Sequence, residues 1–232
     1  MKVIILAGGR GTRLPQSAKN IPKPLVGVGG KTMLQHQIDL LKKHGLSDIK
    51  LSLGYKADQI IRCLNGNYEY IIESKPLGTG GAIKLASKNL KEEFMVLNGD
   101  ILSEINFSDF LNFHKNSPQN NSLTAWYCPE PRDDYGFLSI KNNKILEFQE
   151  KPSSPITGYI NAGFYILSPK IFKNVSRETF SIEKDIFPKL AKRGDLATYI
   201  YKGYWTDAGT EERLKEARER FNKVFHVKQS NN

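Results

Sequence analysis

A short apolar segment that runs directly into closely spaced glycines restricts the fold of this chain more than any other feature. Residues 2–7 are rich in β-branched side chains and are followed at once by Gly8 and Gly9. The apolar run predicts a buried strand, and the glycines predict a loop whose backbone can approach a ligand that a Cβ would exclude. A helical pattern over residues 32–44 stops at Gly45, so the chain opens with a strand–loop–helix unit.

Strands and helices go on alternating through the first half of the chain. The pattern predicts strands at 49–53, 68–72 and 94–97, and helices at 58–64 and 79–90. Such alternation is typical of a mostly parallel sheet covered on both faces.

The second half changes character and predicts a mixed or antiparallel part of the sheet. Short strands are expected at 123–127, 137–140 and 145–148, with a hairpin turn at Asn142 and Asn143, and helices at 182–192 and 211–221. No internal repeat or low-complexity linker divides the chain, so a single domain is expected.

Composition and charge exclude several classes of protein. The 232 residues contain no run near the ~18 consecutive apolar residues of a membrane span, and only two cysteines, which favours the reducing cytoplasm. The net charge of 34 − 24 = +10 favours anionic partners. Because basic runs with interleaved aromatic residues are lacking, a phosphorylated small molecule is favoured over nucleic acid.

The glycine loop has a phosphate-binding character but does not match the two best-known nucleotide loops. Residues 8–13 read GGRGTR, in which glycines let backbone N–H groups approach phosphate and Arg13 adds a cation. Leu14 stands where the dinucleotide fingerprint needs its third glycine, and Leu25 stands where a Walker loop ending at residues 30–32 needs its first. A nicotinamide dehydrogenase is disfavoured, and residues 30–32 are interpreted as a turn before a helix.

The sequence PKPL at residues 22–25 makes the loop specific, because GGRGTR followed by PKPL resembles the sugar-1-phosphate nucleotidyltransferases. These enzymes join a nucleoside triphosphate to a sugar 1-phosphate and release pyrophosphate. Further family-like motifs follow in order: LGTGGA (77–82), NGD (98–100), EKP (150–152), N-x-G (161–163) and W-x-D-x-G-T (205–210). The resemblance implies a single-domain α/β Rossmann-like nucleotidyltransferase (GT-A-like) fold, with a mostly parallel mixed central sheet flanked by helices.

The resemblance also implies a division of the chain and a role for each matching residue. Residues 1–225 would form the domain, with a nucleotide-binding half at about 1–120, a sugar-phosphate-binding half at about 121–225, and a tail at 226–232. Arg13, Lys23 and Asp100 would be catalytic, and Asp100 and Asp207 would bind Mg²⁺. The sugar phosphate would contact Gly136, Glu150, Lys151 and Asn161. The implied nucleotide-binding residues are Leu6, Ala7, Gly8, Gly9, Gly11, Thr12, Arg13, Lys23, Glu73, Pro76, Gly78, Thr79, Asn98 and Gly99.

The sequence constrains the identity of the base and of the sugar less than it constrains the type of reaction. The segment at 73–82 most resembles guanylyltransferases acting on D-glycero-D-manno-heptose 1-phosphate or mannose 1-phosphate, which serve cell-surface glycans. A uridylyltransferase for glucose or N-acetylmuramic acid 1-phosphate stays open, and so does a non-catalytic regulatory subunit, although that would be expected to lose Lys23, Asp100 or Asp207. The expected partners are a nucleoside triphosphate and a sugar 1-phosphate, without nucleic acid or membrane, and a homodimer stays open.

Overall fold

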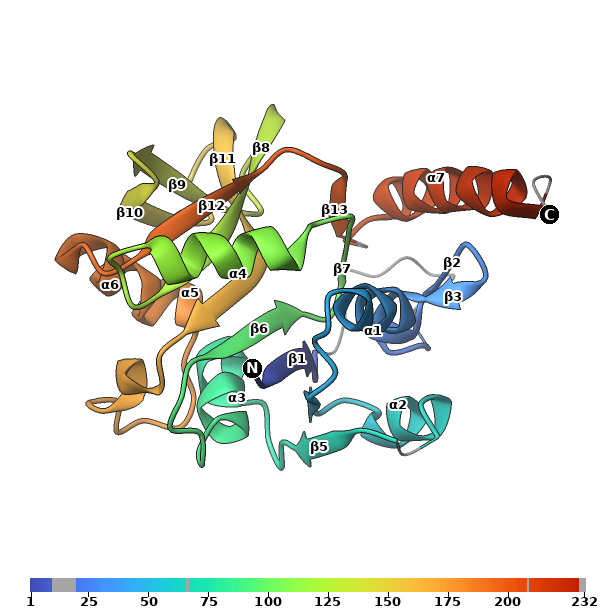
Figure 1. Cartoon of the computed structure of the whole chain (residues 1–232), viewed down its shortest axis with the longest axis horizontal. Coiled ribbons are helices and arrows are strands. Elements are labelled where there is room, and N and C mark those ends of the chain that lie inside the picture. Colours follow the sequence, from blue (N-terminus) through green and yellow to red (C-terminus); the bar gives the residue numbers. More distant parts are fainter. Residues whose placement is uncertain (10–19, 66, 208, 230–232) are drawn as a thin grey trace.

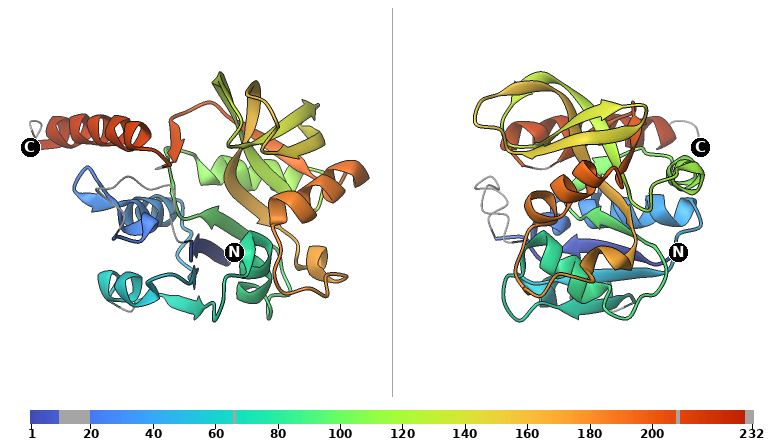
Figure 2. Two further views of the ribbon diagram at one scale, coloured as in Figure 1. Left: turned by 180° about the vertical axis from the view of Figure 1, so that it is seen from behind. Right: turned by 90° about the vertical axis from the view of Figure 1, so that its left-hand side faces the viewer.

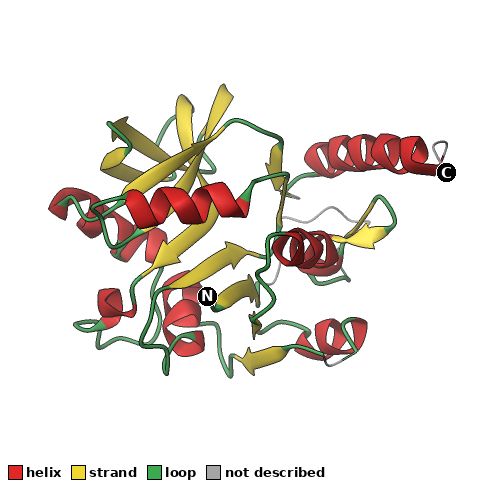
Figure 3. Cartoon of the chain, viewed as in Figure 1, coloured by secondary structure: helices red, strands yellow, loops and turns green. Residues whose placement is uncertain are grey.

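One nine-stranded sheet runs through the middle of the molecule and carries helices on both faces (Figures 1 and 3). The computed structural model describes residues 1–9, 20–65, 67–207 and 209–229. The strand order is β5-β4-β1-β6-β11-β8-β12-β10-β9. These strands are β1 (Val3–Ala7), β4 (Ile49–Leu53), β5 (Glu69–Ile72), β6 (Phe94–Asn98), β8 (Ser122–Arg132), β9 (Gly136–Lys141), β10 (Lys144–Glu150), β11 (Ile156–Leu167) and β12 (Ala197–Tyr201).

The sheet changes direction halfway across. Strands β5, β4, β1 and β6 are parallel neighbours, whereas β11 runs antiparallel to both β6 and β8. Strands β9 and β10 form an antiparallel hairpin whose turn residues, Asn142 and Asn143, both have positive φ, as two-residue hairpin turns require. The predicted mostly parallel mixed sheet is confirmed.

Two small ribbons lie outside the main sheet. Strands β2 (Gly27–Val28) and β3 (Lys31–Thr32) pair with each other, and β7 (Ile101–Ser103) pairs with β13 (Trp205–Asp207). Gly29 and Gly30 both have positive φ and make a tight turn between β2 and β3. The turn predicted at residues 30–32 thus lies one residue earlier, and Lys31 and Thr32 form β3.

Helices begin where side chains satisfy their first amide groups. Thr32 caps α1 by accepting a hydrogen bond from the Gln35 N–H (3.1 Å), and Asn106 caps α4 by accepting from the Ser108 N–H (3.0 Å). The helices are α1 (Met33–Lys43), α2 (Ala57–Cys63), α3 (Gly78–Ala86), α4 (Phe107–Asn116), α5 (Ile182–Asp185), α6 (Phe187–Arg193) and α7 (Glu211–Gln229), with 3₁₀ turns at Lys23–Leu25 and Pro169–Phe172.

The side chains of β1 alternate between two hydrophobic cores. Val3 and Ile5 join the cluster that α1, α2 and α4 cover, whereas Ile4 joins the cluster that α3, α5 and α6 cover. A period of two residues places successive side chains on opposite faces of a sheet. Because both faces are covered, the strand is apolar along its whole length, as its sequence predicted.

Three predicted helices differ clearly from their expected bounds. The helix expected at 79–90 ends at Ala86, and the helix expected at 182–192 is divided at Ile186, because Pro188 lacks the N–H group and its ring would collide with a carbonyl of the preceding turn. Helix α7 continues to Gln229 instead of ending at residue 221, and its carboxyl end projects from the body of the molecule (Figure 2). No helix among the described residues is long and apolar enough to cross a membrane.

Candidate active site

A cleft of about 690 Å³ opens at the carboxyl ends of the parallel strands β1, β4, β5 and β6. Ligands of open α/β sheets bind at this edge, because the loops that leave the strands all meet there. Of the predicted site residues, the cleft is lined by Leu6, Ala7, Gly8, Gly9, Lys23, Glu73, Pro76, Gly78, Thr79, Asn98, Gly99, Asp100 and Asp207. The predicted residues Gly11, Thr12 and Arg13 lie outside the described residues.

Gly8 sits where three loops pass very close to one another. A Cβ at this position would lie 2.7 Å from Glu73 Oε1 and 3.1 Å from the Gly54 nitrogen, so a side chain here would displace the Glu73 carboxylate and press on the loop after β4. Glu73 in turn accepts a hydrogen bond from the Leu77 N–H (3.1 Å). Burial raises the pKa of the Glu73 carboxyl, while this hydrogen bond acts in the opposite direction. The loops after β1, β4 and β5 therefore form one wall of the cleft.

Helix α3 forms the next wall and is fixed to the loop before α5. Gly78 begins the helix with φ +71, and a Cβ there would lie 2.6 Å from the Phe180 carbonyl oxygen. The Thr79 hydroxyl bonds to Glu183 and accepts from the Ile182 N–H (3.0 Å). The segment expected to hold the base thus packs on a segment from the second half of the chain.

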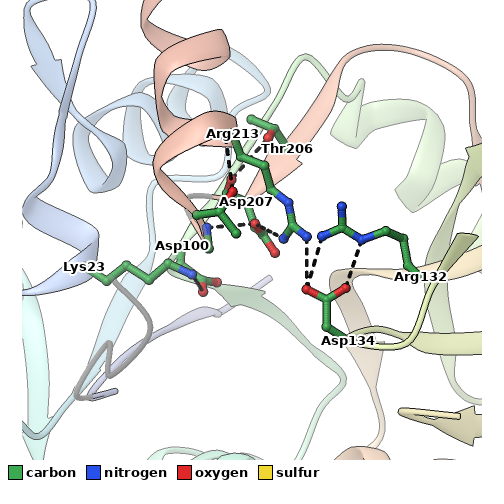
Figure 4. A network of polar contacts seen from close by, with 9 residues as sticks. Lys23, Asp100, Arg132, Asp134, Thr206, Asp207 and Arg213 are labelled. Carbon is green, nitrogen blue, oxygen red and sulfur yellow. Dashed lines mark hydrogen bonds and ion pairs between the residues drawn. The ribbon is translucent and has the colours of Figure 1, made fainter. Parts of the chain in front are cut away.

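Two aspartates from distant parts of the sequence approach each other across the cleft (Figure 4). In the ribbon of β7 and β13, Asp207 pairs with Ile101, which directly follows Asp100. Lys23 Nζ forms an ion pair with Asp100, and Asp207 Oδ1 accepts from the Gly209 N–H (2.8 Å). The ribbon is therefore the element that brings the two carboxylates together.

The electrostatics of Asp207 reflect this crowding. Burial raises the pKa of its carboxyl, Lys23 lowers it, and the negative charge of Asp100 raises it further. The Arg213 guanidinium, 2.8 Å from Asp207 Oδ1, also favours the charged form. A cation between the two aspartates would relieve their mutual repulsion.

The residues present fit the predicted Mg²⁺. The described residues contain no group of three or more His, Cys, Asp or Glu side chains gathered as a metal site. Two carboxylates nevertheless suit Mg²⁺, which is bound by one or two carboxylates and takes its other ligands from phosphate oxygens and water. Asp100 and Asp207 are the side chains that would hold it.

The predicted sugar-phosphate residues adjoin this cleft but are not among its described lining residues. Gly136 pairs with Glu150 across the β9–β10 hairpin, and the Lys151 N–H donates to the Tyr135 carbonyl (3.0 Å). Tyr135 itself lines the cleft. Asn161 donates to the Tyr165 hydroxyl (2.9 Å), which also accepts from Asn98 of the cleft wall (3.4 Å). Their predicted contacts with a sugar phosphate stay predictions.

Sequence patterns do not single out the cluster formed by Arg213, Arg132 and Asp134. Arg213 binds both Asp207 and Asp134, and Arg132 binds Asp134 as well (Figure 4). Asp134 lines the cleft, but the sequence pattern around it predicts only a turn. The only signal for Arg213 is a basic side chain early in an expected helix, which is common on solvated faces.

A cleft at the carboxyl edge of a parallel sheet, walled by glycine-rich loops and closed by two facing aspartates, defines an α/β protein of the nucleotide-binding class. The sequence matches the family model described as nucleotidyl transferase over residues 2–223. The chain belongs to this family, which confirms both the resemblance and the fold class that the motifs predicted.

Curated relatives include mannose-1-phosphate guanyltransferases from fungi. Those of Aspergillus fumigatus and Saccharomyces cerevisiae are 37% and 36% identical over 222 residues. Each alignment covers 90% of this chain and 61% of the relative. The chain therefore spans about six tenths of the length of these relatives.

Solved structures match over nearly the whole chain. HddC from Yersinia pseudotuberculosis, complexed with GMP-PN, is 37% identical with a TM-score of 0.80, and the match covers 95% of this chain and 99% of HddC. A Bacillus anthracis protein described as a candidate glucose-1-phosphate thymidylyltransferase is 28% identical with a TM-score of 0.86, covering 96% and 95% of the two chains. The fold is thus shared over nearly its full extent.

Proposed function

We propose that the protein is a sugar-1-phosphate guanylyltransferase that converts GTP and a mannose- or heptose-type sugar 1-phosphate to a GDP-sugar and pyrophosphate. The observation that carries the proposal is the meeting of Lys23, Asp100 and Asp207 in one cleft beside a phosphate-type glycine loop. A regulatory subunit without activity would have no need to keep these three groups together.

The reaction needs positive charges that offset the negative charges of the phosphates, and it needs no protein nucleophile. An oxygen of the sugar phosphate attacks the α-phosphorus of GTP, and a new phosphorus–oxygen bond forms as the bond to the bridging oxygen breaks. The bonding electrons leave on pyrophosphate, so the charges and atoms balance without a protein-bound intermediate. Mg²⁺, when bound, would supply positive charge where negative charge accumulates on the phosphate oxygens.

The chain's own cations would reduce the repulsion between two anionic substrates. Lys23 already lies against Asp100 at the cleft and is proposed to contact the α-phosphate. Arg13, proposed for the β- and γ-phosphates, belongs to the glycine loop. Lys151 is proposed for the attacking phosphate, because it follows the hairpin that adjoins the cleft. Pre-placed charges of this kind are a large part of phosphoryl-transfer catalysis.

Guanine is favoured because relatives with this nucleotide are similar over most of the chain. The fungal relatives are named as guanyltransferases, and HddC was crystallised with GMP-PN. None of the relatives and solved structures reported above is named as a uridylyltransferase. We further propose that the enzyme works in the cytoplasm for cell-surface glycans such as lipopolysaccharide or capsule, without nucleic-acid or membrane partners, with a homodimer as one arrangement.

A substrate panel tests the proposal. GTP, UTP, CTP and dTTP are each combined with mannose, heptose and glucose 1-phosphates in the presence of Mg²⁺, and released pyrophosphate is measured. We expect GTP to be preferred by about tenfold or more, because a site built to bond one base leaves buried polar groups unpaired with another. Asp100→Asn, which preserves the shape of the side chain, should lose most turnover while keeping the wild-type circular dichroism spectrum.

The panel separates the parts of the proposal. A preference for UTP would contradict the guanylyl assignment but leave nucleotidyl transfer intact. Near-wild-type turnover by Asp100→Asn would contradict the assignment of the acidic pair. No pyrophosphate from any combination would contradict the enzyme assignment as a whole.

A further inference from the structure

One guanidinium group contacts two carboxylates that line the cleft, Asp207 and Asp134. Arg213, in the first turns of α7, places Nη1 2.8 Å from Asp207 Oδ1 and Nη2 3.0 Å from Asp134 Oδ2. Its side chain is only 12% exposed, and its guanidinium lies 5.0 Å from the centre of the Tyr135 ring. Two carboxylates therefore hold the group at its edges (Figure 4), and the Tyr135 ring covers one face.

The two carboxylates belong to different functional sides of the cleft. Asp207 is in β13 and faces the end of β6, where Asp100 lies. Asp134 is in the turn between β8 and β9, directly before Tyr135 and Gly136. Because the Tyr135 carbonyl accepts from the Lys151 N–H, this turn is continuous with the residues proposed to bind the sugar phosphate. Arg213 thus joins the nucleotide side to the sugar side.

A guanidinium suits this position because its geometry is fixed. Its N–H groups form a planar fork, so two carboxylates bound to one guanidinium are held at a set separation and orientation. A lysine carries the same charge as a single flexible point and cannot impose that arrangement. Arg132 binds Asp134 from its other side, with Nε 3.2 Å from Oδ1, which further limits the movement of the turn.

We propose that Arg213 is a positioning residue for the transfer reaction, fixing Asp207 and the Asp134–Gly136 turn relative to each other so that the two phosphates meet in line. The inference rests on the proposed function. It adds a residue that touches neither phosphate and acts through the carboxylates it holds. In-line transfer is sensitive to such placement, because small displacements of reacting groups cost large factors in rate.

Arg213 is not needed to dock α7, which has other anchors. Leu214 and Ala217 are buried in a small core with Val26, Val28, Met33 and Leu102. Farther along the helix, Arg220 binds Glu104 (2.9 Å) and lies 4.3 Å from the Tyr204 ring centre. Arg220 thus has the same side chain on the same helix, paired with a carboxylate and an aromatic ring away from the cleft lining. Arg220→Met is therefore a matched control.

The test compares Arg213→Met, Arg213→Lys, Asp134→Asn and the double variant Arg213→Met/Asp134→Asn with Arg220→Met. We expect Arg213→Met to lower kcat/KM for the sugar 1-phosphate by about 10- to 100-fold, as loss of groups that orient metal ligands usually does. Asp134→Asn should show a similar loss, and the double variant should lose little more than the worse single variant, because both remove one link. Arg213→Lys should recover only part, and Arg220→Met should stay near wild type.

A binding measurement supplies a readout independent of turnover. By titration calorimetry, an unreactive GTP analogue should bind Arg213→Met and wild type with affinities within about threefold, whereas sugar 1-phosphate binding to the analogue-saturated enzyme should weaken about tenfold or more. Thermal unfolding of every variant checks that α7 stays docked. If Arg213→Met does not fold, Arg213→Lys and Asp134→Asn carry the same comparison.

Several results would overturn the inference. Wild-type values of kcat/KM in Arg213→Met, a loss equal to that of Arg220→Met, additive effects in the double variant, or a defect confined to the GTP analogue would each contradict the positioning role. A wild-type enzyme that releases no pyrophosphate would overturn the proposed function and this inference with it. An active wild type beside an equally active Arg213→Met would overturn the inference alone.

Discussion

Three carboxylates in the cleft are held by cations from other elements. Asp100 is paired with Lys23 of the turn at Lys23–Leu25, and Asp207 and Asp134 share Arg213 of α7. A buried charge without a partner costs several kcal/mol, so the pairs allow an acidic cleft to exist in the folded chain. The same pairs place positive charge close to where phosphate groups are proposed to bind.

Lys151 allows a prediction that separates the two substrates. Its backbone adopts φ +52 and donates to Tyr135, while its side chain is 48% exposed and lies 3.9 Å from Glu150. Lys151→Ala should raise the KM for the sugar 1-phosphate about tenfold or more and leave the KM for GTP unchanged, through loss of charge-assisted hydrogen bonds worth ~1.5 to 3 kcal/mol. Steady-state kinetics with each substrate varied in turn measures this.

The exposed Lys141→Ala on the same hairpin is the control for loss of positive charge. A defect of Lys151→Ala that falls on GTP alone, or that Lys141→Ala reproduces, would contradict the role proposed for Lys151.

Sequence motifs predicted the site residues that belong to recognisable loops. They missed Arg213, whose role depends on contacts with residues that are distant in the sequence. Gly8, Glu73, Asp100 and Asp207 were all found from sequence and all line the cleft. Arg213 was not, because nothing in the local pattern of a helix indicates which carboxylates its side chain will meet after folding.

At the scale of the elements, the packing of α3 requires glycines without side chains, and this requirement outweighs their low helix propensity. A Cβ on Gly81 would collide with the Glu178 carbonyl oxygen and lie 2.8 Å from the Leu77 side chain. Gly81→Ala would gain about 1 kcal/mol of helix propensity, but a collision with backbone cannot relax cheaply. We therefore expect a net loss of about 1 to 3 kcal/mol in the free energy of unfolding.

Urea unfolding followed by circular dichroism measures the effect. Gly27→Ala is the matched control, because a Cβ there meets nothing within 4 Å, and it should change stability by less than about 0.5 kcal/mol. A Gly81→Ala variant more stable than wild type would show that propensity, not packing, decides at this position.

Elements with a clear local pattern were predicted well, whereas others, including the central strands β11 and β12 and the helix α4, were missed. Strands β1 and β6 are nearly continuous apolar runs and β4 alternates apolar with polar residues, and all three were placed within a residue of their observed ends. Strand β11 was not predicted, because Gly158, Asn161 and Gly163 look like turn residues. In the structure both glycines have positive φ and the pairing with β8 shifts register around them, so they make irregularities inside a long strand.

Across the whole molecule, charges tie the first strands of the sheet together at one end. Lys2 binds Asp48 and Glu69, and Lys50 also binds Glu69, at 2.6 to 2.8 Å. Hydrogen bonds from Lys2 and Lys50 lower the pKa of the Glu69 carboxyl. Because the folded pKa lies below the unfolded value, the stabilisation is present above the unfolded pKa and is lost as the pH falls through the folded pKa.

Glu69→Gln should therefore lower the free energy of unfolding at pH 7, and the difference from wild type should shrink as the pH falls below the usual glutamate range. The Glu69 side chain is 51% exposed, so solvent screening limits the effect to about 1 kcal/mol or less, and added salt should reduce it. Urea unfolding over a pH series measures the trend, with the exposed Glu92→Gln as control. A difference that is constant with pH would contradict the ion-pair explanation.

The ribbon of β7 and β13 has a consequence for how the protein comes into being. Asp100 leaves the ribosome before Asp207, which arrives with β13, and the pairing of Asp207 opposite Ile101 brings the two carboxylates together. Contacts between distant parts of a chain form late, after their loop-closure entropy has been overcome. A nascent chain or a fragment without β13 thus carries half of the acidic pair, and the cleft becomes competent only after β13 has been made and has paired with β7.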